Sequence, residues 1–216
     1  MTTQRQSEID DIFTLLTYAL VYQDWQPDTV PRKDRRGYNI GALLVNPEHH
    51  PVHFDLNCIN STDNATQHGE VRAITSYITA QRCFNLSGYT IYTSLEPCVM
   101  CAGMITMVAI DRAIFGQHDV AYSKAFERLT LDLGTDVHPY PRVVQAQASS
   151  LKFCRQLDEA YQNFLKVDNE KVLAKFLASQ KAKDIYKQAN EAFLEYEVLN
   201  EQNQAIYKSA IKFLNP

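Results

Sequence analysis

Strand-like and helix-like patterns alternate along most of this chain, and that alternation limits its fold more than any other feature does. The expected strands are residues 39–46, 52–58, 89–95, 112–116 and 143–147. The expected helices are residues 7–22, 68–83, 97–108, 121–133 and 150–166. At the start of the first helix, Ser7 and Asp10 resemble a capping box. Strands that alternate with helices are typical of a layered α/β domain, which we predict over residues 1–166.

The chain after residue 166 has a different composition. Residues 168–214 contain no Gly and no Pro, and apolar residues recur there at rough helical spacing. This pattern predicts one or two amphipathic helices that pack on the domain or on a partner subunit. We therefore treat residues 167–216 as a C-terminal helical extension. Tyr186, Tyr196 and Tyr207 are candidates for an oligomer face or for internal packing.

The overall composition is that of an ordinary globular protein, with 45% hydrophobic and 21% charged residues among 216. No apolar run reaches the ~20 residues that a membrane span needs, and the N-terminus lacks the apolar core of a secretory signal. Five cysteines in such a chain indicate a reducing compartment, where thiols bind metals or do chemistry more often than they pair. We expect a cytoplasmic protein without a membrane partner.

Charge limits the range of partners. The formal net charge is −4, so a strongly basic nucleic-acid-binding surface is not expected. The dense basic cluster of the chain is Arg32, Lys33, Arg35 and Arg36. This cluster either binds a substrate phosphate or an RNA backbone, or forms a solvated loop.

Two short motifs stand at the starts of expected helices. They are His68-Gly69-Glu70 and Pro97-Cys98-Val99-Met100-Cys101. Cys98 and Cys101 are three residues apart, so their sulfurs project from one face of a helix. The free N–H groups and the positive end of the helix dipole lie at this position and favour thiolates.

Together the two motifs have the composition of a catalytic zinc site. Two thiolates and the His68 imidazole are three zinc ligands, and an open fourth position distinguishes catalytic from structural zinc. Zinc lowers the pKa of a water at that position to about 7. Glu70 is placed to carry a proton from the water to a leaving amine. H-x-E followed by P-C-x-x-C is the pattern of zinc deaminases that act on cytosine or adenine.

Each motif alone has a simpler interpretation. Cys98 and Cys101 suit a core helix as small apolar residues, and His68 with Glu70 suits a solvated helix start. A redox role for the C-x-x-C pair leaves the histidine and the glutamate unexplained. The combination therefore favours zinc. The remaining cysteines stand at apolar positions and are expected to be buried thiols: Cys58, Cys83 and Cys154.

The segment Leu95-Glu96-Pro97-Cys98-Val99-Met100-Cys101-Ala102-Gly103 resembles the cytidine deaminase-like superfamily, in the branch of tRNA adenosine deaminases and bacterial guanine deaminases. The resemblance covers about residues 7–165. It implies a three-layer α/β/α sandwich with a mixed five-stranded sheet, and two zinc-bearing helix N-termini side by side. It also implies that His68, Cys98 and Cys101 hold zinc, that Glu70 shuttles the proton, and that the chain forms a homodimer.

The resemblance extends to residues that would contact the substrate. Asn57 stands at the position of an asparagine that contacts the base in this branch, and Asn60 is the alternative if the loop is displaced. Asn57 also suits an ordinary turn at a strand end. The pair Gly41-Ala42 matches a first-strand element whose backbone borders the base pocket. The family often has an acidic residue near the site after the fourth strand. The residues at this place are His118 and Asp119, which are therefore further candidates for the pocket.

Several positions depart from the family pattern. Gly69 stands where the family usually has Ala, and Asn39 where it usually has Pro. Residues 106–110 replace a His-Ser-Arg-like segment of tRNA deaminases, and residues 59–67 replace a proline-bearing loop. The C-terminal helices exceed what the catalytic domain needs. These departures argue against tRNA as the substrate.

The sequence thus predicts a zinc-dependent hydrolytic deaminase of a nucleobase or nucleoside, a purine rather than a pyrimidine. In this prediction, activated water attacks the amine-bearing ring carbon and ammonia leaves. The alternatives are a tRNA-specific adenosine deaminase and a non-catalytic deaminase-like subunit. The glutamate that such a subunit would typically have lost is present as Glu70.

Overall fold

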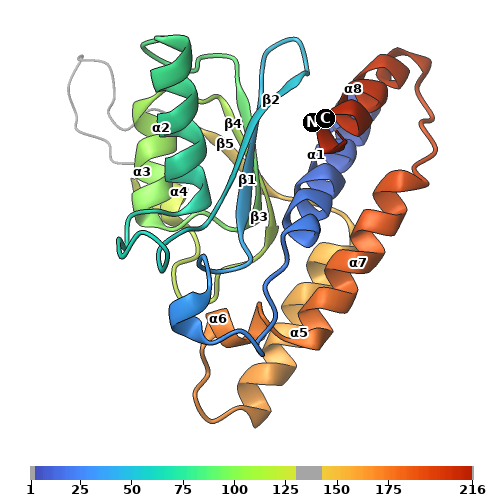
Figure 1. The fold of residues 1–216 in the computed structure, drawn as a ribbon. Helices are drawn as coiled ribbons and strands as arrows, with labels where there is room; N and C mark the ends of the chain where they lie inside the picture. Colours follow the sequence, from blue (N-terminus) through green and yellow to red (C-terminus); the bar gives the residue numbers. More distant parts are fainter. Residues whose placement is uncertain (1–2, 130–142, 216) are drawn as a thin grey trace.

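A computed structural model describes residues 3–129 and 143–215 of the chain, and its centre is a five-stranded mixed sheet (Figure 1). The strand order is β2-β1-β3-β4-β5. β1 pairs antiparallel with β2 and β3, whereas β3, β4 and β5 run parallel. The strands are Gly41–Val45 (β1), Pro51–Leu56 (β2), Thr90–Leu95 (β3), Arg112–Gln117 (β4) and Gln145–Ala148 (β5).

Helices cover both faces of this sheet. Figure 1 shows α2, α3 and α4 on one face and α1, α5, α7 and α8 on the other. The first group is Gly69–Gln81 (α2), Val99–Met107 (α3) and Ala125–Leu129 (α4). The second group is Gln4–Gln23 (α1), Lys152–Val167 (α5), Gln180–Leu194 (α7) and Gln204–Leu214 (α8). The predicted α/β fold with its mixed five-stranded sheet is confirmed.

Each central strand divides its side chains between two apolar cores. In β3, Ile91 packs in the core under α2 and α3, whereas the next residue, Tyr92, packs in the core under α1. Leu43 and Leu44 of β1 divide in the same way. Side chains alternate along a strand, so a strand that is apolar throughout must be covered on both faces. This accounts for the two helical layers.

The first helix begins earlier than its sequence pattern predicts. Its N-cap is Thr3, whose hydroxyl oxygen accepts a hydrogen bond of 3.2 Å from the backbone N–H of Gln6. Ser7 lies inside the helix, so the capping box is wrong. Asp10 has a different role, because its carboxylate is buried and forms an ion pair of 2.7 Å with Arg112. A carboxylate engaged on another element is not available to cap a helix.

The chain after residue 166 forms more elements than predicted. It contains the short helix α6 (Leu173–Phe176), then α7, a 3₁₀ helix over Glu201–Asn203 and α8. α7 packs on α1 and α5, so the extension contacts the domain itself. Tyr186 is fully buried, with its ring 4.8 Å from that of Tyr18, and it belongs to internal packing. The boundary at residue 166 stays a prediction.

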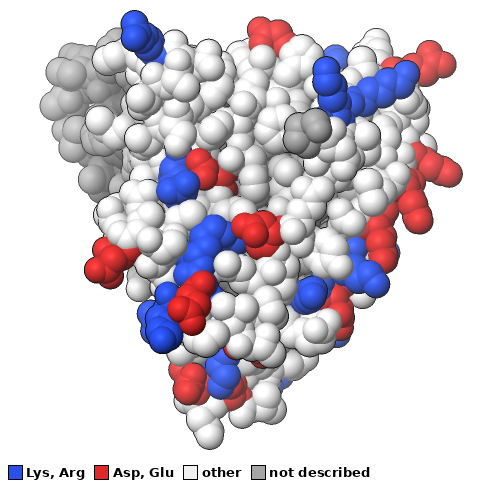
Figure 2. Space-filling view, in the orientation of Figure 1, with Lys and Arg blue, Asp and Glu red and all other residues white. Residues whose placement is uncertain are grey.

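The other boundaries differ by a few residues at most where the structure describes them. The predicted helix 121–133 is observed as α4 up to Leu129, and its remainder lies outside the described residues. None of the helices in the described ranges has the length and apolarity that a membrane crossing requires. Figure 2 shows basic and acidic side chains interspersed over one face of the molecule.

Candidate metal centre and the cavity around it

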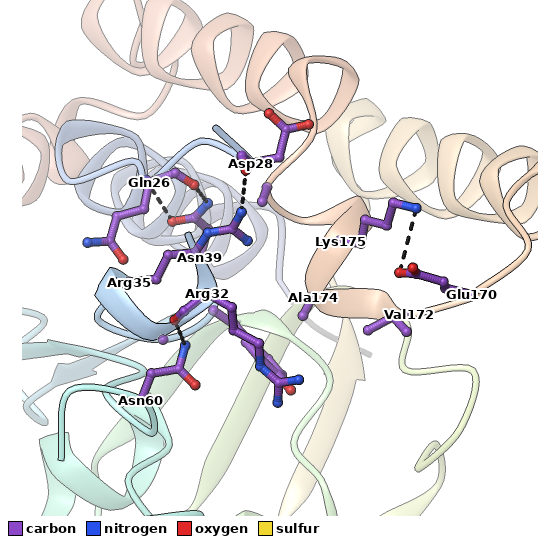
Figure 3. Close-up of a pocket in the computed structure, with 13 residues that line it drawn as sticks. Gln26, Asp28, Arg32, Arg35, Asn39, Asn60, Glu170, Val172, Ala174 and Lys175 are labelled. Carbon is purple, nitrogen blue, oxygen red and sulfur yellow. Dashed lines mark hydrogen bonds and ion pairs between the residues drawn. The ribbon is translucent and has the colours of Figure 1, made fainter. Parts of the chain in front are cut away.

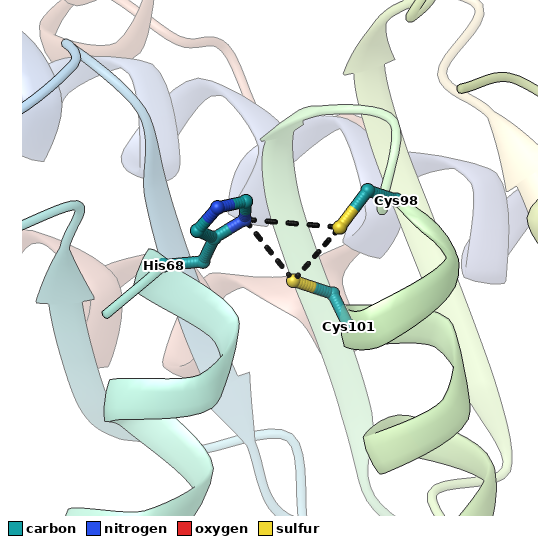
Figure 4. Close-up of side chains that lie close together, drawn as sticks. All are labelled: His68, Cys98 and Cys101. Atoms are coloured by element: carbon teal, nitrogen blue, oxygen red, sulfur yellow. Dashed lines mark hydrogen bonds between the residues drawn. The ribbon is translucent and has the colours of Figure 1, made fainter. Parts of the chain in front are cut away.

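The starts of α2 and α3 bring the two motifs together. His68 and Cys98 are the N-cap residues of these helices, both with extended backbone angles, and Cys101 lies in the first turn of α3. The Nδ1 atom of His68 lies 3.8 Å from the Cys98 sulfur and 3.5 Å from the Cys101 sulfur. The two sulfurs are 3.6 Å apart (Figure 4). Three potential ligand atoms thus form a compact triangle.

The size of this triangle fits a zinc ion. With zinc–sulfur bonds of about 2.3 Å and zinc–nitrogen bonds of about 2.0–2.1 Å, a tetrahedral site separates its sulfurs by about 3.8 Å and each sulfur from the nitrogen by about 3.6 Å. The observed separations of 3.5–3.8 Å agree with these values. Among residues 3–129 and 143–215, one group of three or more side chains is arranged to hold a metal, and it is His68, Cys98 and Cys101. The predicted zinc ligands are therefore brought together.

The three ligands influence one another's protonation. The hydrogen bond between the two thiols lowers the pKa of Cys98 to about 4, and His68 adds to this effect against the cost of burial. The same hydrogen bond and burial raise the pKa of Cys101. The Cys98 hydrogen bond in turn raises the pKa of His68. The pair of thiols therefore loses its first proton more easily than its second.

Glu70 lies beside this triangle, in the first turn of α2. Its side chain is 3% exposed and lines the same cavity as His68 and Cys98. Burial raises the pKa of Glu70, although its own backbone N–H and the charge of His68 oppose the shift. A carboxyl group with a raised pKa is well suited to take up and return a proton near neutral pH.

A cavity of about 520 Å³ opens over these residues. Its walls come from the segment before β1, from the loop after β4 and from the start of α6, where the lining residues include Ile40, Tyr122 and Leu173. This volume is in the range of small-molecule sites, and the walls are mainly apolar with a few polar groups.

Asn57 is the predicted base-contacting residue that the structure places at the cavity. It is buried, and its side-chain oxygen accepts a hydrogen bond of 3.1 Å from the backbone N–H of Tyr38. Across the described part of the chain, its amide nitrogen has no hydrogen-bond acceptor, so a donor remains at the cavity wall. Asn60, the alternative, donates instead to the backbone oxygen of Arg32 at 3.2 Å and lies outside this cavity.

Gly41 and Ala42 lie behind the cavity. Both are buried in β1 and neither is among the lining residues, whereas the preceding Ile40 is. Gly69 explains why the backbone of β1 comes close to α2. A Cβ atom at this position would lie 3.1 Å from the backbone oxygen of Asp55 and 3.3 Å from the nitrogen of Ala42. Glycine therefore allows the metal-bearing helix to approach the strand closely.

A buried carboxylate that the sequence analysis missed holds the loop after β4 in place. Glu96 accepts hydrogen bonds from the backbone N–H groups of Asp119 at 3.2 Å and Lys124 at 2.8 Å. Asp119 lines the cavity, but His118 is directed away and contacts Asp158 at 2.8 Å. The sequence signal for this role of Glu96 was its position: a charged residue at the end of the apolar strand β3, directly before Pro97.

The C-terminal extension provides a wall that the sequence analysis also missed. The lining residues Lys171, Val172, Leu173 and Ala174 come from the turn before α6 and from α6 itself. Asp168 holds this turn by accepting hydrogen bonds from the N–H groups of Glu170 at 2.9 Å and Lys171 at 3.2 Å. The wall lacks a catalytic motif, and only an Asx-type turn signal at Asp168 marks it in the sequence.

The basic cluster is divided by the fold. Arg36 contacts Asp24 at 3.0 Å and donates to the backbone oxygen of Asn57 at 2.6 Å, so it fixes the segment that carries Asn57. Arg35 donates to two backbone oxygens of its own loop, and Arg32 lines a second cavity. Of the remaining cysteines, Cys58 and Cys154 are buried as predicted, and Cys83 is half-buried.

Comparisons with known proteins agree with this geometry. Residues 29–117 match the family described as the cytidine and deoxycytidylate deaminase zinc-binding region. A tRNA-specific adenosine deaminase of Rickettsia bellii is 35% identical over 81 residues, which are 37% of this chain and 56% of the relative. A probable cytosine deaminase of Schizosaccharomyces pombe is 34% identical over 84 residues, which are 39% of this chain and 50% of the relative.

The chain thus spans about half the length of the curated relatives it matches. Among solved structures, a guanine deaminase from Nitrosomonas europaea has a TM-score of 0.44 at 14% identity, over 88% of this chain and 86% of that chain.

Proposed function

We propose that this chain, whose residues 29–117 match the cytidine and deoxycytidylate deaminase zinc-binding region, hydrolyses the exocyclic amino group of a nucleobase or nucleoside with zinc as its cofactor. One observation carries the proposal. A zinc-sized set of two thiols and an imidazole borders a cavity that also contains the buried carboxyl group of Glu70. A structural zinc site usually has four protein ligands and no such cavity.

The residues around the cavity divide the chemistry among them. Bound by His68, Cys98 and Cys101, zinc would supply the Lewis acid that makes water a nucleophile at neutral pH. Glu70 takes the proton of this water and passes it to the ring and to the amino group, because its buried carboxyl group lines the cavity beside the ligands, whereas that of Glu96 is bound by backbone N–H groups. The water oxygen forms a bond to the ring carbon, the carbon–nitrogen bond breaks, and ammonia leaves.

The same proposal assigns the substrate-binding residues. The free amide nitrogen of Asn57 donates a hydrogen bond to an acceptor on the base. Gly41 and Ala42 act from behind the cavity, as the strand backbone that positions Ile40 and the start of α2. A cavity of about 520 Å³ has room for a bicyclic base, so we favour a purine.

A tRNA-specific adenosine deaminase is the second candidate, because relatives of that name from Rickettsia bellii and Haemophilus influenzae match the chain. The net charge of −4 and the interspersed charges of Figure 2 argue against a large RNA surface. Binding of a tRNA anticodon stem-loop that weakens steeply with salt would favour this candidate. We also expect a homodimer, which sedimentation measures directly.

Ammonia release by zinc-loaded protein tests the proposal. The substrates are guanine, adenine, adenosine, cytosine, cytidine, dCMP and a tRNA, each with wild-type protein and with Glu70→Ala. We expect turnover of a free base or nucleoside by the wild type alone. Activity on tRNA alone would favour the second candidate. Equal activity of the variant would refute the role of Glu70, and silence across the panel with stoichiometric zinc would favour the non-catalytic subunit.

A further inference from the structure

A second cavity adjoins the first one. It has a volume of about 450 Å³ and lies between the 3₁₀ helix Arg32–Asp34 and the turn that leads into α6 (Figure 3). Tyr38, Val172 and Ala174 line both cavities. The two cavities are therefore neighbours, with these three residues on their common border.

Two guanidinium groups in the second cavity have no carboxylate partner among the residues that the structure describes. Arg35 donates to the backbone oxygens of Val30 and Asp28, both at 2.6 Å, and these neutral acceptors fix the side chain without neutralising it. Arg32 is exposed, and its side chain has no hydrogen bond or ion pair to any residue that the structure describes. Arg36 of the same cluster, by contrast, is paired with Asp24 at 3.0 Å.

The lysine of this cavity, unlike these two arginines, is paired with carboxylates. Lys175 contacts the carboxylates of Asp168 at 2.6 Å and Glu170 at 3.6 Å. Figure 3 shows the Glu170 carboxylate facing Lys175, and the Asp28 carboxylate turned away from Arg32. Within the described part of the chain, Arg32 and Arg35 are therefore the lining cations without a carboxylate partner.

We propose that this second cavity binds a phosphate group of the substrate, so that the protein acts on a nucleotide more readily than on the corresponding nucleoside or free base. The inference rests on the proposed deaminase function and deepens it. A guanidinium group binds phosphate through paired N–H donors, and Arg32 has all of its donors available for this. The base lies at Glu70, the sugar passes Tyr38 and Val172, and the phosphate lies at Arg32.

The preference for phosphorylated substrate is the quantity to measure. Adenosine, guanosine and cytidine are each compared with their 5′-monophosphates and with a trinucleotide RNA that contains the same base, using kcat/KM for ammonia release. We expect the wild type to prefer the phosphorylated form of its substrate by about 10- to 100-fold, as a charged hydrogen bond predicts. Arg32→Gln should lose most of this preference, and Arg32→Lys should keep part of it.

Lys33→Gln is the matched control, since Lys33 is the exposed neighbour of Arg32 in the same 3₁₀ helix and does not line the cavity. It should keep the full preference. A preference for the monophosphate assigns the phosphate to a mononucleotide, and a preference for the trinucleotide alone assigns it to an RNA strand. Either preference supports the site if Arg32→Gln removes it. Equal kcat/KM for all three forms, or a preference that survives in Arg32→Gln, would overturn it.

A separate binding measurement distinguishes this inference from the deaminase function. Calorimetry on zinc-loaded protein compares each nucleoside with its 5′-monophosphate and does not require turnover. If no ammonia is released but the monophosphates bind at least tenfold tighter in an Arg32-dependent manner, the reaction is wrong and the phosphate site is supported. If ammonia is released and calorimetry finds no such difference, the phosphate site is wrong and the deaminase function stands.

Discussion

The two faces of the sheet contribute to the candidate site in different ways. From one face, the starts of α2 and α3 supply His68, Glu70, Cys98 and Cys101, the groups that can hold a metal and move a proton. From the other face, the C-terminal extension supplies a wall without chemical groups of this kind, at Lys171–Ala174. The chemistry of this site is therefore local in sequence, whereas its shape depends on packing between distant segments.

One buried side chain connects the two regions. The amide nitrogen of Asn39 donates to the backbone oxygens of Gln26 at 2.8 Å and of Leu177 at 2.9 Å. Its oxygen accepts from the N–H of Gln26 at 3.0 Å. Asn39 stands where the resemblance leads one to expect a proline, which has no amide to offer. This departure and the presence of the extension are therefore linked physically.

The largest effect is expected on the chemical side. Glu70→Gln keeps the size of the side chain but removes the group that accepts a proton, so kcat should fall by about 10²–10⁴-fold. Zinc content should not change, because the three ligands remain. Ammonia release and metal analysis measure the two quantities.

Glu159→Gln, on the exposed side of α5, is the control and should behave as the wild type. If Glu70→Gln loses both its zinc and its activity, the carboxyl group positions the ligands and does not carry the proton.

The next largest effect is expected on the packing side. Phe193 is fully buried in α7, with its ring 5.7 Å from that of Tyr207. Phe193→Ala should lower the free energy of unfolding by about 3–5 kcal/mol. Urea unfolding measures this, with Leu194→Ala as the control because the neighbouring leucine is half-exposed.

A single cooperative transition in both variants would mean that the extension and the sheet unfold together. A separate early transition in Phe193→Ala would instead support an independent unit after residue 166.

The same contrast explains what the sequence could predict. His68, Cys98 and Cys101 were predictable because their spacing and their positions at helix starts already determine which atoms meet. The contacts of Leu173 were not, because α6 reaches the cavity only after the chain has crossed the sheet and returned. The predicted start of the first helix was wrong because of another distant contact: Asp10 forms an ion pair with Arg112 of β4.

The connection between the regions should show an intermediate effect. Asn39→Ala removes three hydrogen bonds and leaves the part-buried backbone groups of Gln26 and the buried carbonyl of Leu177 without partners. The expected loss is about 2–3 kcal/mol in the free energy of unfolding. Because α6 forms a wall of the cavity, KM should rise more than kcat falls.

Denaturant unfolding and steady-state kinetics measure these effects, with the exposed Asn85→Ala as the control. A fall in kcat at constant KM would contradict the role of Asn39 as a residue that positions the wall.

The smallest effect concerns three acidic residues in the first half of α1. Glu8 accepts a hydrogen bond of 2.7 Å from Asn203, and Asp10 is paired with Arg112, but Asp11 has no hydrogen bond or ion pair within the described ranges. Burial, then the charges of Asp10 and Glu8, raise the pKa of Asp11 to about 6. A raised carboxyl pKa means that ionisation destabilises the folded state, so this cost appears as the pH rises from about 4 through 6.

Asp11→Asn should therefore raise the free energy of unfolding by about 1 kcal/mol at pH 7.5, a value reduced for partial solvent exposure, and leave it unchanged at pH 4. Urea midpoints at the two pH values measure the difference, with the exposed Asp184→Asn as the control. An equal gain at both pH values would mean that the effect comes from packing or hydrogen bonding and not from the charge.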